Sequence, residues 1–201
     1  MNVRPVIAVF FALAPAFAEK VTLEIDNPWV HVTRVVLAPR EKTPVREYAP
    51  SVIVYLTDTT AHRDGDTAHF EAGARAEENT TSHPVEEVIV EFKPGSPPIA
   101  RQPNLRDPVK LDPEHHTVDF ENDRARVLRT VLVPHVRSPM HDHPPYVVVY
   151  LTELHTKMAL SDGRQVDNPR RKGEVAWRDA MHHSTENIGA EIASEIQVEL
   201  K

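Results

Sequence analysis

The sequence predicts an all-β protein made of two similar units in tandem. Many segments are short, rich in β-branched residues and bounded by Pro, Asp or Asn, with 18 prolines and only 6 glycines in 201 residues. No segment of helical length shows a 3.6-residue period with capping residues at its ends. Repeated short strands without helical periodicity are typical of sandwiches and barrels.

The second unit is a copy of the first. Residues 21–57 align without a gap onto residues 116–152, and residues 65–93 align onto residues 173–201, with 23 identities in 66 positions. A unit of roughly 75–85 residues buries only a modest core, so we expect the two copies to pack against each other.

The first 18 residues are predicted to be a secretory signal peptide. Arg4 provides a basic start, residues 6–14 form an apolar run, and residues 16–18 are a small-x-small signature, so cleavage is expected after Ala18. The alternative is an N-terminal membrane anchor, but the run is shorter than the ~20 residues that span a bilayer. The protein is therefore expected to be periplasmic or secreted, and without cysteine it has no disulfides.

The charge of the chain limits its partners. The formal net charge is −7, and it becomes one unit more negative when the signal peptide with Arg4 is removed. An acidic balance argues against nucleic acid and against an anionic membrane surface, and it favours cations slightly. A small-molecule ligand and a homodimer are both compatible with the sequence.

Strand-like segments occur at equivalent places in both copies. Residues 52–56 and 147–151 are apolar runs, residues 127–133 form another, and residues 195–200 alternate polar and apolar side chains. The predicted domains follow the repeat: a signal peptide at 1–18, an N-terminal domain at 19–93, a linker at 94–115 and a C-terminal domain at 116–201. Proline fixes φ and cannot donate to a sheet, so the proline-rich linker is predicted to be extended and semi-rigid.

The copies differ in length in the middle. The first copy joins its two aligned blocks with 7 residues (58–64), whereas the second uses 20 (153–172). Within the longer segment, Asp162-Gly163 has the composition of a hairpin turn, flanked by strand-like residues 158–160 and 164–166.

A histidine motif stands out in the second copy. His141 and His143 lie two residues apart, so on a strand they point to the same face. Imidazole is a common ligand for divalent transition metals, and His183 provides a third imidazole from a distant segment. The alternative is that the pair are ordinary exposed loop histidines.

The second copy resembles the cupin superfamily. That family has a His-x-His motif followed by Glu, and a Gly-led strand ending in His-x-x-x-Asn. His141 and His143 fit the first motif, and Gly173 to Asn187, with His183, fits the second. The resemblance covers nearly all of residues 19–201 and implies two tandem antiparallel jelly-roll (cupin) barrels, which is a bicupin.

Two departures from the cupin motifs concern the ligands. Val147 and Val148 stand where the glutamate is expected, so the resemblance implies a three-histidine site, as in some cupin dioxygenases. The second motif is one residue short, so either His182 or His183 could face the site. We favour His183 because its spacing to Asn187 matches.

A site of three imidazoles does not select one metal. Fe, Mn, Zn, Ni and Cu all remain open. Acidic residues near the motifs that could orient the imidazoles are Asp142, Asp179 and Glu186. Tyr146 and Trp177 could line the pocket, although Trp177 could equally pack against the neighbouring barrel. His115 and His116 are interpreted as solvent-exposed residues at the edge of the linker.

The first copy lacks the three histidines. Arg46, Tyr48 and Arg75 occupy their positions, and arginine stays protonated and does not ligate metals. If these side chains face inward they would suit an organic anion. The favoured alternative is a degenerate half kept for packing.

Three functions stay open at this point. The first is a metal-dependent oxygenase or isomerase acting on a small molecule, for which Glu153 and Asp179 are the candidate general bases. The second is a module that binds a metal or small ligand without turnover. The third is a structural protein with a vestigial site.

Overall fold

The computed structural model describes residues 20–100 and 105–201, so the predicted signal peptide lies outside the described residues. This part of the chain forms sixteen strands and one short helix, and every paired strand is antiparallel. The all-β prediction is therefore confirmed. No helix of the described residues is long and apolar enough to cross a membrane.

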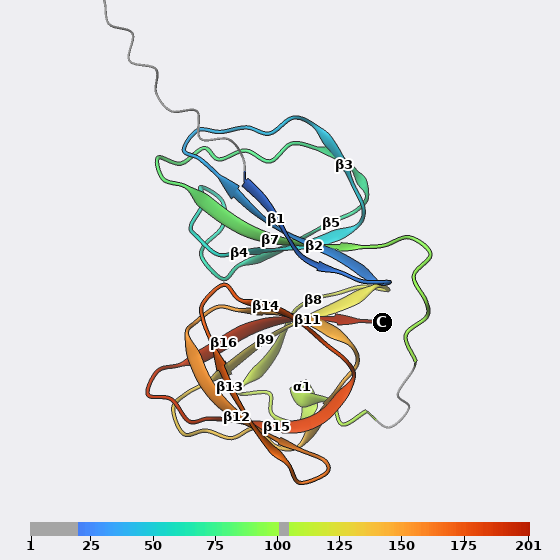
Figure 1. Ribbon diagram of the computed structural model, residues 1–201, viewed down its shortest axis with the longest axis vertical. Helices are drawn as coiled ribbons and strands as arrows, with labels where there is room; N and C mark the ends of the chain where they lie inside the picture. Colours follow the sequence, from blue (N-terminus) through green and yellow to red (C-terminus); the bar gives the residue numbers. More distant parts are fainter. Residues whose placement is uncertain (1–19, 101–104) are drawn as a thin grey trace, which may run out of the picture.

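The first barrel consists of β1 (Lys20–Asp26), β2 (Val30–Leu37), β3 (Arg46–Tyr48), β4 (Ser51–Tyr55), β5 (Thr67–Phe70), β6 (Gly73–Arg75) and β7 (Val85–Phe92). The second consists of β8 (His116–Glu121), β9 (Ala125–Leu132), β10 (His141–His143), β11 (Tyr146–Tyr150), β12 (Leu154–Leu160), β13 (Gln165–Arg170), β14 (Val175–Arg178), β15 (Met181–Asn187) and β16 (Ala193–Leu200). Each barrel has one five-stranded sheet, in the orders β1-β2-β7-β4-β5 and β14-β11-β16-β9-β8. Figure 1 shows these two sheets facing each other across the middle of the molecule.

The second sheets of the two barrels differ in size. The second barrel has a four-stranded sheet in the order β10-β15-β12-β13, whereas the first has only the pair β3-β6. The two additional strands are the predicted hairpin, which turns at Gly163 with φ of 84°. Because residues 58–64 replace this hairpin, the first barrel has no wall equivalent to β12 and β13.

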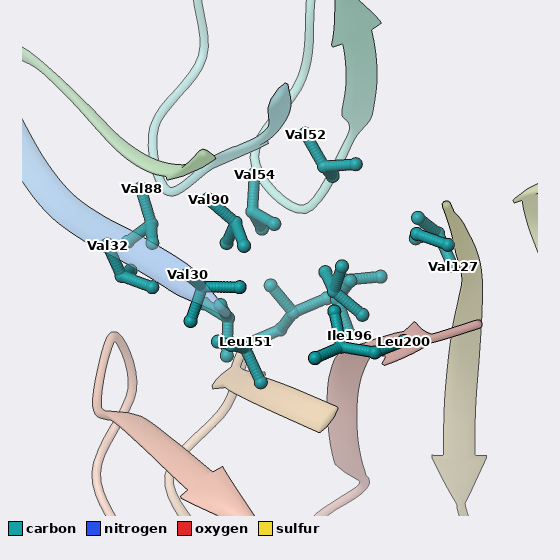
Figure 2. Packing of buried hydrophobic residues seen from close by; sticks show 14 of the residues in the cluster. Val30, Val32, Val52, Val54, Val88, Val90, Val127, Leu151, Ile196 and Leu200 are labelled. Carbon is teal, nitrogen blue, oxygen red and sulfur yellow. The ribbon is translucent and has the colours of Figure 1, made fainter. Parts of the chain in front are cut away.

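The largest core of the protein lies between the two barrels. Fifteen buried hydrophobic residues from both five-stranded sheets form one cluster, part of which is drawn in Figure 2. Each barrel interior contributes a separate, smaller cluster of six. The five-stranded sheets are thus buried on both faces, which explains the unbroken apolar runs at 52–56 and 147–151. The expected packing of the copies on each other is confirmed.

Reciprocal contacts join the barrels. The Arg34 guanidinium donates to the carbonyl of Gly173, and its counterpart Arg129 donates to the carbonyl of Gly65 at 2.7 Å. Gly65 has φ of 88° and Gly173 has φ of 81°, and a Cβ on either would approach the other barrel to 3.3–3.4 Å. Equivalent groups that contact each other reciprocally define an approximate two-fold relation.

The described residues of the linker depart from the predicted extended form, with turns at 94–95 and 113–115 and a helix between them. Residues Pro108–Leu111 form a single helical turn, α1. The Asp107 carboxylate accepts from the Val109 amide at 3.0 Å, and Pro108 occupies the first turn, where its missing N–H is not needed. Asp107 and Pro108 therefore start a helix here. The high proline content of the linker did not predict it.

The joint core predicts that both barrels unfold together. Val149→Ala removes methyl groups from a fully buried position between the barrels, and we expect a loss of about 2 kcal/mol in the free energy of unfolding. Trp29 and Trp177, the only tryptophans, stack across the interface at 5.4 Å, so their fluorescence reports on it. Denaturation followed by fluorescence and by circular dichroism should give one coincident transition.

Val118→Ala is the matched control, because Val118 is exposed and its loss should change the free energy by less than about 0.5 kcal/mol. Two separate transitions, or equal effects of the two variants, would contradict a shared core.

Candidate metal centre

Three histidines converge inside the second barrel. His141 and His143 lie on β10, and His141 is directly opposite His183 on the neighbouring strand β15. Alternate residues of β10 face inward, so both of its histidines are buried, and so is His183. One ring nitrogen from each lies within 4.8 Å of the others. His182 points the other way and bonds to Asp142.

The hydrogen bonds of these rings leave nitrogens for a metal. Nδ1 of His141 lies 2.7 Å from the Pro139 carbonyl oxygen, and Nδ1 of His143 lies 2.6 Å from a Glu199 carboxylate oxygen. Nε2 of His143 and both nitrogens of His183 are buried without a partner. Two nitrogens bound at about 2.1 Å to one ion can be at most about 4.2 Å apart. No hydrogen bond fixes the ring of His183, so this ring can turn to bring its nitrogen closer to the other two.

Burial keeps the three imidazoles neutral. It lowers the pKa of His141, and it lowers the pKa values of His143 and His183 well below the ordinary value, with the neighbouring imidazoles adding to the effect in the latter two. Neutral imidazole is the form that ligates metals. The residues present therefore fit a divalent transition metal.

Glu199 is the acidic partner of the site, and the sequence did not reveal it. Its other carboxylate oxygen accepts from Arg126 Nε at 2.7 Å, and burial raises its pKa to about 6. A carboxylate that accepts from the far nitrogen of a ligating imidazole orients the ring and raises its basicity. The period-two alternation of residues 195–200 was the available signal, since it places Glu195, Gln197 and Glu199 on one face.

The three acidic residues expected to orient the imidazoles do not contact them. Asp142 accepts from the backbone N–H of Arg106, and its other oxygen bonds to His182. Asp179 accepts from the Trp177 indole at 3.0 Å. Glu186 pairs with Arg137 on the surface. Asp142 and Glu186 lie on strands, where alternation turns them away from the side that carries the histidines, and Asp179 lies just beyond the end of β14.

A small cavity of about 20 Å³ adjoins the histidines, with room for about one water molecule. Its polar lining includes Glu195, Gln197 and Thr130, and the Gln197 amide donates to Glu195 at 2.6 Å. Burial raises the pKa of Glu195 above its ordinary value. Glu153 and Asp179, the predicted general bases, are both exposed outside this cavity.

His116 corrects another expectation. It was interpreted as exposed, yet it is 2% exposed and its ring lies 5.1 Å from that of His141. It begins β8 opposite Thr130, on the inward-facing side. Burial lowers its pKa to about 4. Its neighbour His115 is also partly buried, against Asp112 at 2.7 Å.

The two aromatic residues have different roles. Tyr146 is buried beside the site, with its ring 5.1 Å from that of His143. Trp177 stacks on Trp29 of the first barrel, which was the alternative interpretation. Val147 and Val148, which stand where the cupin motif has its glutamate, are buried among other apolar residues. Neither of them can ligate a metal.

The first barrel uses the corresponding positions differently. Arg46 is paired with Arg75 in the register in which His141 meets His183. The Arg75 guanidinium lies 3.8 Å from the centre of the Tyr48 ring and donates to Glu77 at 2.9 Å. Its charge is thus paired with that of Glu77, while its Nη1 atom is buried without a hydrogen-bond partner.

No family model and no curated protein matches the sequence. Among solved structures, AerE from Microcystis aeruginosa is similar over 95% of both chains, with a TM-score of 0.63 and 12% identity. A cupin 2 conserved barrel domain protein from Leptotrichia buccalis matches over 94% of this chain and 92% of its own (TM-score 0.53, 12% identity).

Oxalate decarboxylase from Bacillus subtilis matches over 85% of this chain and 68% of its own, with a TM-score of 0.59 and 13% identity. At these identities the likeness concerns the fold. The chain has the cupin fold in a two-barrel arrangement, so the fold that the resemblance implied is confirmed.

Glu87 in the first barrel predicts a dependence of stability on pH. Burial, with the nearby charge of Glu77, raises its pKa to about 8 from 4.5. A raised carboxyl pKa means that the folded state holds the proton more tightly, so stability falls as the pH rises from 4.5 through 8. We expect Glu87→Gln to abolish about 2–4 kcal/mol of this loss between about pH 5 and pH 9.

Urea denaturation of wild type and variant at both pH values measures the difference. Taking this difference cancels the contributions of Glu195 and Glu199, whose pKa values are raised in the same direction. The same loss of stability in both proteins would show that Glu87 does not titrate in this way.

Proposed function

We propose that the second barrel binds one divalent transition metal through His141, His143 and His183. The observation that carries this proposal is the set of buried, neutral imidazole nitrogens that lack hydrogen-bond partners. Each unsatisfied buried polar group costs about 1–3 kcal/mol, and a metal ion would relieve several at once. Fe, Mn, Zn, Ni and Cu suit this donor set.

The residues around the histidines have separable tasks in this proposal. A bound metal would supply a Lewis acid able to bind and polarise an oxygen ligand. Glu199 holds the ring of His143, and Arg126 holds Glu199. Gln197 and Glu195 form the polar wall of the cavity, whose small volume excludes bulk water and large ligands.

Binding of a metal with a water-sized ligand is the function that the geometry supports best. The cavity of about 20 Å³ does not accommodate an aromatic substrate. Turnover of a small substrate is the second candidate, and Glu195 favours it, because it is a buried carboxyl group beside the cavity whose pKa burial raises, and such a group can hold and release a proton.

The metal site is tested by elemental analysis and thermal unfolding. We expect wild type to bind about one metal ion per chain and to unfold at a higher temperature when metal is added. His141→Ala combined with His143→Ala should lose both properties. His182→Ala is the control, since this neighbouring histidine faces away from the site. No bound metal, with equal metal-induced stabilisation of all three proteins, would refute the site.

Glu199→Gln tests the supporting carboxylate. The amide keeps the shape but loses the charge that holds His143, so metal affinity should fall about 10–100-fold. Glu91→Gln is the matched control, because Glu91 is the equivalent residue of the first barrel, where it accepts from the Ala49 amide at 3.0 Å. Competition with a chelator measures both affinities. Equal affinities would assign Glu199 no role at the metal.

Catalysis is tested on the metal-loaded protein with small carboxylates. Oxalate is a suitable first substrate because the similar Bacillus subtilis structure is an oxalate decarboxylase. Turnover that Glu195→Gln reduces at least about tenfold would support an enzyme with Glu195 as the proton-transferring group. A loaded protein without turnover would support a binding module.

Export of the protein is also a proposal. It rests on the signal-like residues 1–18 and predicts a mature chain that begins at Glu19. Mass spectrometry of the protein from a periplasmic or extracellular fraction tests this start. An uncut chain confined to the cytoplasm would contradict it.

A further inference from the structure

The first barrel contains a pocket that the metal proposal does not use. It has a volume of about 140 Å³ and is bounded by the loop 58–64 and by inward residues of β4 and β7. It occupies the place that the cavity of about 20 Å³ occupies in the second barrel. The difference follows from the hairpin: β12 closes the second barrel with Leu154 and Thr156, and the first barrel has no such strand.

A buried carboxylate without a partner faces this pocket. Glu87 is 6% exposed, and its Oε1 atom has no hydrogen-bond partner. The equivalent acid of the second barrel, Glu195, receives the Gln197 amide, but the residue equivalent to Gln197 is Ile89, which cannot donate. A buried carboxyl group without a donor is costly, so this position is suited to a ligand that brings one.

When Glu87 is ionised, above its pKa of about 8, the charges around the pocket specify a single positive charge. Glu77 is balanced by Arg75, and Glu78 pairs with Lys42 at the surface at 2.8 Å. Glu87 is therefore the one lining acid without a cationic partner among the described residues. Within that part of the chain, the three-histidine group is the only set of side chains close enough to hold a metal, so an inorganic divalent ion lacks ligands here.

Aromatic rings form another wall of the pocket. Tyr55 and His62 both line it and stack on each other with their ring centres 4.2 Å apart and their planes 9° apart. The side-chain amide of Asn79 is bonded to backbone carbonyls, including that of Ala38 at 2.8 Å, so it is not free for a ligand. An aromatic surface beside an acid suits a cation that carries an apolar part.

We propose that the first barrel is a binding site for a small organic monocation, an aliphatic ammonium whose N–H groups donate to Glu87 and whose carbon chain packs on Tyr55 and His62. The ligand and the site are distinct from the metal and the histidines of the second barrel. Both copies keep the inward acid, Glu87 in the first and Glu195 in the second, but only the second keeps the amide that donates to it. The first copy therefore lacks the metal ligands and is suited to a different kind of ligand.

The test uses three probes of the same size and different charge: n-propylammonium, 1-propanol and propionate. Binding to the full mature chain is followed at about pH 9, where the Glu87 carboxyl is ionised, by methyl shifts in nuclear magnetic resonance spectra. We expect saturable binding of n-propylammonium, with a dissociation constant in the millimolar range or below, and binding at least about tenfold weaker for the other two probes. The shifts should include residues 58–64 and β7.

Glu87→Gln should weaken n-propylammonium binding at least about tenfold, since it removes the charge and keeps the shape. Glu195→Gln is the matched control at the equivalent position, and it should leave binding unchanged. His62→Ala, a change in a surface loop that leaves the buried core intact, should weaken binding severalfold and serves as a second variant. The proposal is overturned by no saturable binding, by equal binding of 1-propanol, or by equal weakening in the two glutamine variants.

Discussion

The face-to-face packing of the two five-stranded sheets is the constraint on which the rest of the structure depends. Its cluster of fifteen buried hydrophobic residues exceeds the six in either barrel interior. Because burial between the barrels supplies most of the apolar contact, the interiors are free to hold polar groups. β16 illustrates this: Ile196 and Val198 pack between the barrels, while Glu195, Gln197 and Glu199 face inward.

The same constraint explains which residues the two copies still share. Arg34 and Arg129 remain identical because each bonds to a glycine carbonyl of the opposite barrel. Those glycines also keep a positive φ that other residues rarely adopt. Inward positions carry no such reciprocal requirement. The pair of histidines on β10 and β15 could thus become a pair of arginines, Arg46 and Arg75, without altering the strand pairing.

The sequence predicted those features that depend on local patterns or on comparison of the copies. Period-two alternation and turn residues gave the strands and the hairpin, and the spacing to Asn187 distinguished His183 from His182. Glu199 and His116 escaped prediction because their positions depend on strand pairing across long separations, with Glu199 56 residues from His143. The turn α1 was missed because proline content was taken as evidence for extension, although Pro108 occupies a helical first turn.

The atoms left without partners in the two interiors differ in kind, and this difference carries functional information. In the second barrel they include imidazole nitrogens of His143 and His183, whose lone pairs call for a Lewis acid. In the first barrel a carboxylate oxygen of Glu87 calls for a hydrogen-bond donor with positive charge. Because the core between the two barrels stabilises the duplicated fold, the two barrel interiors can bind different kinds of ligand. Each requirement can be tested without disturbing the other, because the two sites share no residue.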